Sequence, residues 1–198
     1  EVTFWEARIE NRWALDLGEL KNSLRPNTRA VIINSPHNPT GAQMGQADFR
    51  ELNTLTRERG IMFFSDEVYR GLEYNPADRL PPACELNLQA VSLGVMSKTY
   101  GLAGLRIGWI ATQNESVMAR MAAMKDYTTI CSSAPSEYLS ELALRHRDQI
   151  ADRNLQIIAG NLRLLDEFFA ARADRFEWVR PQAGPISFPR LLSGEISS

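Results

Sequence analysis

Lys98 and Arg106 are two cationic residues that follow an apolar, strand-like run ending at Met96, in a stretch with three glycines. A lysine that is partly desolvated there loses stability as an ammonium ion, so it can act as a neutral amine that attacks a carbonyl carbon. An arginine among glycines can bind a phosphate, because its planar guanidinium matches phosphate oxygens and glycine lets backbone amides come close. The stretch therefore indicates covalent chemistry beside a phosphate group.

Asp66 adds an acid to this pair, since it closes a second apolar run, IMFFSD. A carboxylate at the end of a neighbouring strand can hold a positive charge on a heterocyclic nitrogen. Lysine, acid and arginine together are what a pyridoxal phosphate site requires: an aldehyde anchor, a pyridinium partner and a phosphate clamp. Taken singly, each has a plainer interpretation, as a loop lysine, a turn or a helix start. The combination therefore carries the prediction.

The elements that would position these groups alternate between helix-like and strand-like runs. Amphipathic spacing predicts helices over residues 15–25 and 46–60. Apolar and β-branched runs predict strands over residues 29–36, 61–69, 90–97 and 105–112, and an alternating run over Val2–Arg8 indicates one more. This order predicts an α/β fold with a mostly parallel sheet covered on both faces by helices.

Polar side chains cluster just past the carboxyl ends of three of these strands. They are Asn38, Asp66, Tyr69, Ser97 and Lys98. Ligands bind at that edge of an open α/β sheet. The proposed lysine chemistry and the expected ligand edge therefore coincide.

The carboxyl-terminal third has a different pattern. Residues 133–146 predict a helix, and residues 148–173 predict a helix of about 24 residues, roughly 36 Å long, which could bridge two domains. Residues 176–191 have the pattern of a strand, a turn and a strand. We therefore predict a large domain over residues 1–147. Over residues 148–198 we predict an interdomain helix and the start of a second, incomplete domain.

Composition and charge argue against several other classes of protein. The net charge is −2 with acids and bases interspersed, so no basic face indicates nucleic-acid binding. The longest apolar runs are about five residues, too short to span a membrane, and the start has no signal-peptide pattern. Cys84 and Cys131 match no metal or disulfide spacing, so we expect no metal site and a cytoplasmic location.

Three motifs strongly resemble the class I/II aminotransferases, which are fold-type I pyridoxal-phosphate enzymes. They are NSPHNPTG at residues 34–41, SDEVYRGLEY at 65–74 and MSKTYGLAGLRIGW at 96–109. Their order and spacing also match the family, from about Leu15 to about Leu191. The resemblance implies a three-layer α/β/α large domain, with its amino-terminal part absent, followed by the beginning of a C-terminal α+β small domain.

The resemblance implies three catalytic residues. Lys98 would form the internal Schiff base with pyridoxal 5′-phosphate, and would later move the proton between Cα of the substrate and C4′ of the cofactor. Asp66 would keep the pyridinium nitrogen protonated, and Tyr69 would hydrogen-bond the phenolic oxygen. The substrates would be an amino acid and a 2-oxo acid, and the full-length protein would be a homodimer.

Three further residues would bind the cofactor if the resemblance holds. Asn38 would share the phenolic oxygen with Tyr69, and the Asn38–Pro39 bond is a candidate cis peptide. Arg106, helped by Ser97, would bind the phosphate.

The chain also departs from the family pattern. A phosphate-binding serine is common three residues before the lysine, where this chain has Val95. The arginine that grips the substrate carboxylate should lie beyond Ser198, since Arg180 and Arg190 come too early. The isolated 198 residues are therefore expected to have little or no transaminase activity.

Two other functions remain open from the sequence. The same residues also support decarboxylation, elimination, cyclisation or racemisation, because the reaction depends on which bond at Cα is held perpendicular to the ring. From a different class, the chain could be the sensing domain of a transcriptional regulator that keeps the cofactor pocket. A winged-helix DNA-binding segment upstream of Glu1 would favour the regulator.

Overall fold

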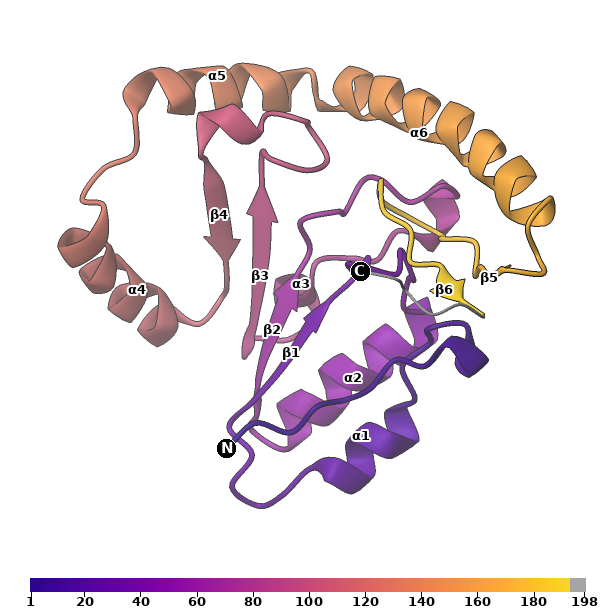
Figure 1. The fold of residues 1–198 in the computed structure, drawn as a ribbon. Helices are drawn as coiled ribbons and strands as arrows, with labels where there is room; N and C mark the ends of the chain where they lie inside the picture. The colour runs from indigo at the N-terminus through magenta and orange to yellow at the C-terminus, as the bar shows by residue number, and fades with distance from the viewer. Residues whose placement is uncertain (193–198) are drawn as a thin grey trace, which may run out of the picture.

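The computed structural model describes residues 1–192 and is built on a four-stranded sheet (Figure 1). The strands, in spatial order, are β1 (Ala30–Asn34), β2 (Met62–Asp66), β3 (Ala90–Val95) and β4 (Gly108–Ala111). The first three run parallel and β4 is antiparallel to β3. The predicted mostly parallel sheet is therefore confirmed, and its four main strands are all present.

Within residues 1–192, six helices accompany the sheet. They are α1 (Leu17–Ser23), α2 (Gln46–Glu58), α3 (Ala83–Leu86), α4 (Glu115–Thr128), α5 (Ala134–Arg145) and α6 (Arg147–Ala170). Short 3-10 turns lie at Ile9–Asn11, Pro76–Asp78 and Ala103–Leu105. None of the helices in the described part of the chain combines the length and the apolar composition needed to cross a membrane.

One face of the sheet forms the main core with α1 and α2. Alternate residues of β1 point to opposite faces, so Val31 is buried against the helices while Ile32, on the other face, is 70% exposed. From α2, Phe49 packs edge-on against Phe63 of β2, with the ring centroids 5.9 Å apart. Full burial of such a side chain stabilises a fold by about 1.5–3 kcal/mol. This apolar layer packs α1 and α2 against β1 and β2.

The amino-terminal segment and α4 differ from the sequence-based expectation. The strand predicted over Val2–Arg8 is wrong: the segment is extended but pairs with no strand of the described chain, and Trp5 Nε1 instead donates to Asp16 O at 2.9 Å. The helix α4 was not predicted, because none of its side chains is buried and its apolar residues make no single stripe. Its start is capped by Asn114, whose side chain accepts from Val117 N.

The carboxyl-terminal region follows the predicted order of elements. Helix α6 has 24 residues and arches over the sheet to reach β5 (Phe176–Glu177), which pairs with β6 (Arg190–Leu191) (Figure 1). The end of α6 is fixed by aromatic packing, since Phe169 stacks on Trp178 with centroids 4.7 Å apart. The segment between β5 and β6 returns to the loops that follow the carboxyl ends of β1 and β2.

Candidate active site

The six residues predicted to bind or act on the cofactor all line one cavity at the carboxyl ends of β1, β2 and β3. The cavity has a volume of about 390 Å³. Its lining consists of Asn34, Asn38, Asp66, Val68, Tyr69, Val95, Ser97, Lys98, Ala103 and Arg106. Because β1, β2 and β3 are parallel, the loops that follow them meet at the same edge, which is why residues far apart in sequence converge.

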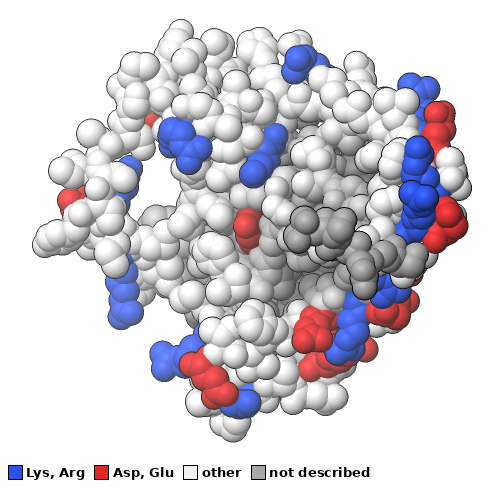
Figure 2. Space-filling view, viewed as in Figure 1, with Lys and Arg blue, Asp and Glu red and all other residues white. Residues whose placement is uncertain are grey.

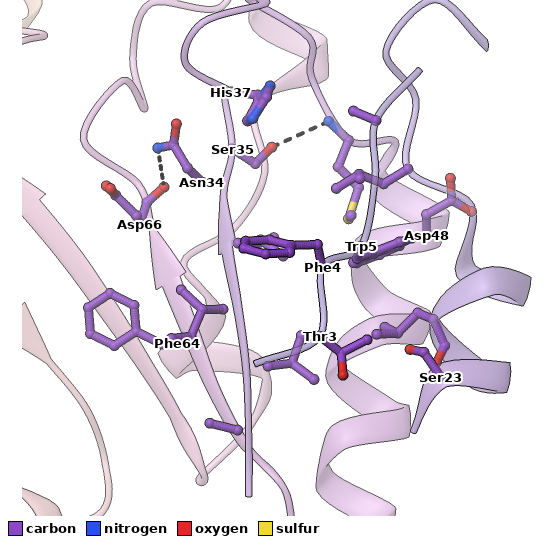
Figure 3. A pocket seen from close by; sticks show the side chains of 18 of the residues that line it. Thr3, Phe4, Trp5, Ser23, Asn34, Ser35, His37, Asp48, Phe64 and Asp66 are labelled. Carbon is purple, nitrogen blue, oxygen red and sulfur yellow. Dashed lines mark hydrogen bonds between the residues drawn. The ribbon is translucent and has the colours of Figure 1, made fainter. Parts of the chain in front are cut away.

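Asn34 links Asp66 to the turn that carries Asn38, residues 35–41, called here the asparagine turn. It is the last residue of β1 and stands opposite Asp66 in the ladder. Its side-chain amide donates to Asp66 O at 3.1 Å (Figure 3), and its side-chain oxygen accepts from Asn38 N at 2.7 Å. Asn34 is not among the site residues predicted from the sequence, although its position as a polar residue at a strand end is a signal that could have identified it.

Asn38 and Tyr69 form a pair at the cavity wall. Asn38 Nδ2 donates to Tyr69 Oη at 3.2 Å, and the Asn38–Pro39 peptide is cis, as expected. The Tyr69 ring is only 3% exposed, so its hydroxyl is held by a fixed ring. The two groups can therefore present hydrogen-bond donors to the same ligand oxygen.

Asp66 is half-buried at the end of β2. Burial raises the pKa of its carboxyl, and the Val68 amide, Asn34 and the charge of Lys98 offset this only in part. The Val68 amide donates to Asp66 Oδ1 at 3.2 Å. A carboxylate left partly uncompensated in this way is stabilised by a cationic partner in the cavity.

Lys98 and Arg106 flank the cavity on the loop after β3. Lys98 Nζ lies 5.8 Å from the centroid of the Tyr69 ring. The prediction of a partly desolvated lysine is wrong for the described chain: Lys98 is exposed, because the cavity opens to solvent. Arg106 has a left-handed backbone, with φ of +54°, and its guanidinium donates to Ala103 O at 3.0 Å.

Thr99 connects the loop that carries Lys98 (residues 96–107, the lysine loop) to the loop that carries Tyr69 (residues 67–75, the tyrosine loop). Its hydroxyl lies within hydrogen-bond distance of both Val68 O (3.2 Å) and Arg70 O (2.9 Å), and the residue is 3% exposed. Its carbonyl oxygen accepts from Asn154 Nδ2 of α6 at 2.9 Å. Thr99 was not predicted from the sequence, because nothing in the local pattern shows which carbonyl groups a loop threonine will contact.

Val95 also lines the cavity, at the position where the family commonly has serine. Valine cannot donate a hydrogen bond, so on this loop the cavity is lined by three side chains that can, those of Ser97, Lys98 and Arg106. Within residues 1–192, no three His, Cys, Asp or Glu side chains are grouped so that they could hold a metal ion.

A larger groove of about 1050 Å³ adjoins the cavity along β1 (Figure 3). It shares Asn34 and Asp66 with the cavity and is otherwise lined largely by the amino-terminal segment and the edge of β1. On the face shown in Figure 2, acidic and basic side chains are mixed and form no extended basic area.

Comparison with known proteins identifies the family. The sequence profile described as aminotransferase class I and II matches residues 1–194. The chain belongs to this family. Class I and II aminotransferases depend on pyridoxal 5′-phosphate.

Individual aminotransferase-family relatives support the assignment. Capreomycidine synthase from Streptomyces vinaceus is 31% identical over 96% of this chain and 48% of that protein. Aromatic-amino-acid aminotransferase 2 from Thermococcus litoralis is 33% identical over 69% of this chain and 35% of that protein. A solved PLP-dependent aminotransferase from Streptococcus suis superposes with a TM-score of 0.90 at 33% identity, covering 98% of this chain and 51% of that one. The chain thus spans at most about half the length of these relatives.

Proposed function

We propose that this chain forms part of an aminotransferase that moves an amino group between an amino acid and a 2-oxo acid, using pyridoxal 5′-phosphate held by Lys98. The observation that carries the proposal is the convergence of Asp66, Tyr69 and Lys98 on one cavity. Membership of the aminotransferase family supports it.

The residues of the cavity fit the chemistry of this cofactor. Burial raises the pKa of Asp66 because it disfavours the charged carboxylate. A pyridinium nitrogen would offset this cost by placing a positive charge beside the carboxylate. A volume of about 390 Å³ lies within the usual range for small-ligand sites. When bound, the cofactor supplies an electron sink for charge that develops at the substrate Cα.

Each residue then has a defined task. Lys98 Nζ would hold the cofactor through its aldehyde carbon, and as a free amine it would carry the proton taken from the substrate Cα. Tyr69 and Asn38 donate to the phenolic oxygen. Arg106 and Ser97 bind the phosphate, Arg106 through its planar fork.

We further propose the domain arrangement and assembly of the full-length protein. Residues 1–147 belong to the cofactor-binding large domain, and residues 148–198 comprise an interdomain helix and the start of the small domain. The length and arch of α6 support this boundary (Figure 1). The full-length protein is proposed to be a cytoplasmic homodimer.

Borohydride trapping tests the role of Lys98. The printed sequence has three lysines, Lys21, Lys98 and Lys125. After incubation of the full-length protein with cofactor and reduction, mass spectrometry of the peptides should find the cofactor on Lys98. The Lys98→Ala variant should lose this adduct and Lys125→Ala should keep it. An adduct that persists in Lys98→Ala at the wild-type level would show that a residue other than Lys98 binds the cofactor.

A second reaction class is favoured by one specific relative. Capreomycidine synthase is not named as an aminotransferase, and it matches 96% of this chain. The same cavity could therefore serve another pyridoxal-phosphate reaction, such as a cyclisation. Incubation of the full-length protein with a panel of amino acids and 2-oxoglutarate separates the two: formation of glutamate supports transamination, and a changed amino acid without glutamate supports the alternative.

A further inference from the structure

Residues 181–184, the segment Pro-Gln-Ala-Gly, lie between the asparagine turn and the tyrosine loop. On the asparagine side, Gln182 N and Ala183 N both donate to Gly41 O, at 2.8 and 3.1 Å. Gln182 Oε1 also accepts from Gln43 N at 3.2 Å, across 139 residues of sequence. Gly41 lies three residues after Asn38, so the segment holds the turn that carries this amide.

The same segment is bonded to the tyrosine loop on its other side. Tyr74 N donates to Gln182 O at 3.1 Å, and Gly184 N donates to Leu72 O at 2.9 Å. The Tyr74 hydroxyl donates to Gly184 O at 2.7 Å. Burial raises the pKa of Tyr74 to about 12, so this hydroxyl remains protonated and able to donate at neutral pH.

Residues 181–184 are closely packed against both loops. Ala183 has no exposed surface, and a Cβ added to Gly184, whose φ is +76°, would lie in van der Waals contact with the Tyr69 ring, 3.6 Å from Cδ1. On the opposite side, a Cβ on Gly41 would lie 2.4 Å from Pro181 Cβ. The segment is therefore in direct contact with both loops.

We propose that residues 181–184 act as a positioning clasp, which sets the distance between the Asn38 amide and the Tyr69 hydroxyl and thereby their joint hydrogen bonding to the cofactor phenolic oxygen. The inference rests on the proposed cofactor site. Two donors on the phenolic oxygen compete with the protonated nitrogen that joins Lys98 to the cofactor for the negative charge on that oxygen. Loosening the clasp weakens this competition, so the linking nitrogen holds its proton to higher pH.

The test is a pH titration of the absorbance of the lysine-bound cofactor in the full-length protein. The conservative variant is Tyr74→Phe, which removes the bond to Gly184 O and keeps the ring; Gly184→Ala is the stronger variant. Both should move the midpoint of the absorbance change upward, by roughly half a pH unit or more. The matched control is Ser187→Ala, which removes the hydrogen bond from Trp178 Nε1 and none of the hydrogen bonds that join residues 181–184 to the two loops; its midpoint should equal that of the wild type.

The outcomes separate this inference from the proposed function. If the wild type binds cofactor through Lys98 and Tyr74→Phe titrates at the wild-type midpoint, with only its melting temperature lowered, the segment is structural and the clasp is refuted while the cofactor site stands. If the wild type forms no lysine-bound cofactor, the proposed function fails and the clasp fails with it. A midpoint shift in Tyr74→Phe that is absent in Ser187→Ala supports the clasp.

Discussion

The side-chain amide of Asn34 donates to the main-chain oxygen of Asp66 across 3.1 Å, at the position where β1 and β2 pair for the last time. The same side chain accepts from Asn38 N, so one residue aligns the acid and the asparagine turn. The cavity is thus held together by groups that do not themselves need to touch the cofactor.

Replacing Asn34 by alanine should weaken both the fold and the site. Two hydrogen bonds are lost, which costs about 1–3 kcal/mol of unfolding free energy, and cofactor affinity should fall with the misaligned acid. Thermal unfolding and a fluorescence titration with pyridoxal 5′-phosphate measure the two effects. Asn75→Ala, which removes an exposed turn bond to Ala77 N, serves as the control and should leave affinity unchanged. Equal affinities in both variants would contradict the role of Asn34.

Asp66→Asn should stabilise the cofactor-free protein and weaken cofactor binding. Burial raises the folded-state pKa of Asp66 above its unfolded value of about 3.8, so the wild type loses stability relative to Asp66→Asn as pH rises through the folded-state pKa. The two proteins should therefore differ at pH 7 and converge below about pH 4. Melting temperatures across this pH range check the sign. A wild type that is the more stable protein at pH 7 without cofactor would show that the carboxylate is already compensated.

Gly41 and Gly60 form a matched pair for the effect of the 181–184 segment. Both have a left-handed backbone, with φ of +67° and +63°, but an added Cβ meets Pro181 at 2.4 Å in the first case and nothing within 4 Å in the second. Gly60→Ala should cost roughly 1–2 kcal/mol for backbone strain alone. Gly41→Ala should cost a further ~1–3 kcal/mol for overpacking. Denaturant unfolding compares them, and equal losses would mean that the contact with Pro181 is not tight.

Thr99→Val should destabilise the junction between the lysine and tyrosine loops. The buried hydroxyl is replaced by a methyl group of similar size, which leaves the carbonyl groups of Val68 and Arg70 without this donor and costs about 1–3 kcal/mol. Thr99→Ser keeps the hydroxyl and should recover most of the loss. Hydrogen exchange at the amides of residues 68–72 reads the loop directly. Unchanged exchange in Thr99→Val would show that the hydroxyl does not tie the loops together.

Several features of this protein were accessible from the sequence alone. Apolar runs that end in polar residues located β1, β2 and β3, because strands of a parallel sheet are typically apolar on both faces and the chain becomes polar where it leaves the sheet. Asp66 and Lys98 stand at or just beyond two of these ends, so their convergence follows from the parallel order of the strands. The family resemblance rests on the same local motifs, and the family match confirms it.

Other features depended on contacts that no local pattern contains. The pairing of Tyr74 with Gly184 joins residues 110 positions apart, and Thr99 receives a bond from Asn154 of α6. The strand predicted at Val2–Arg8 failed for the same reason, since alternation provides a surface for pairing but not a partner.

The sequence by itself thus determined which side chains could do chemistry and at which edge they would gather. Residue types and the order of strands along the chain can both be read from it directly. The tertiary structure alone decided how those side chains are held, through Asn34, Thr99 and residues 181–184. Hydrogen bonds and close packing between distant segments form only once the whole chain has folded, so they leave no periodicity in the sequence to recognise.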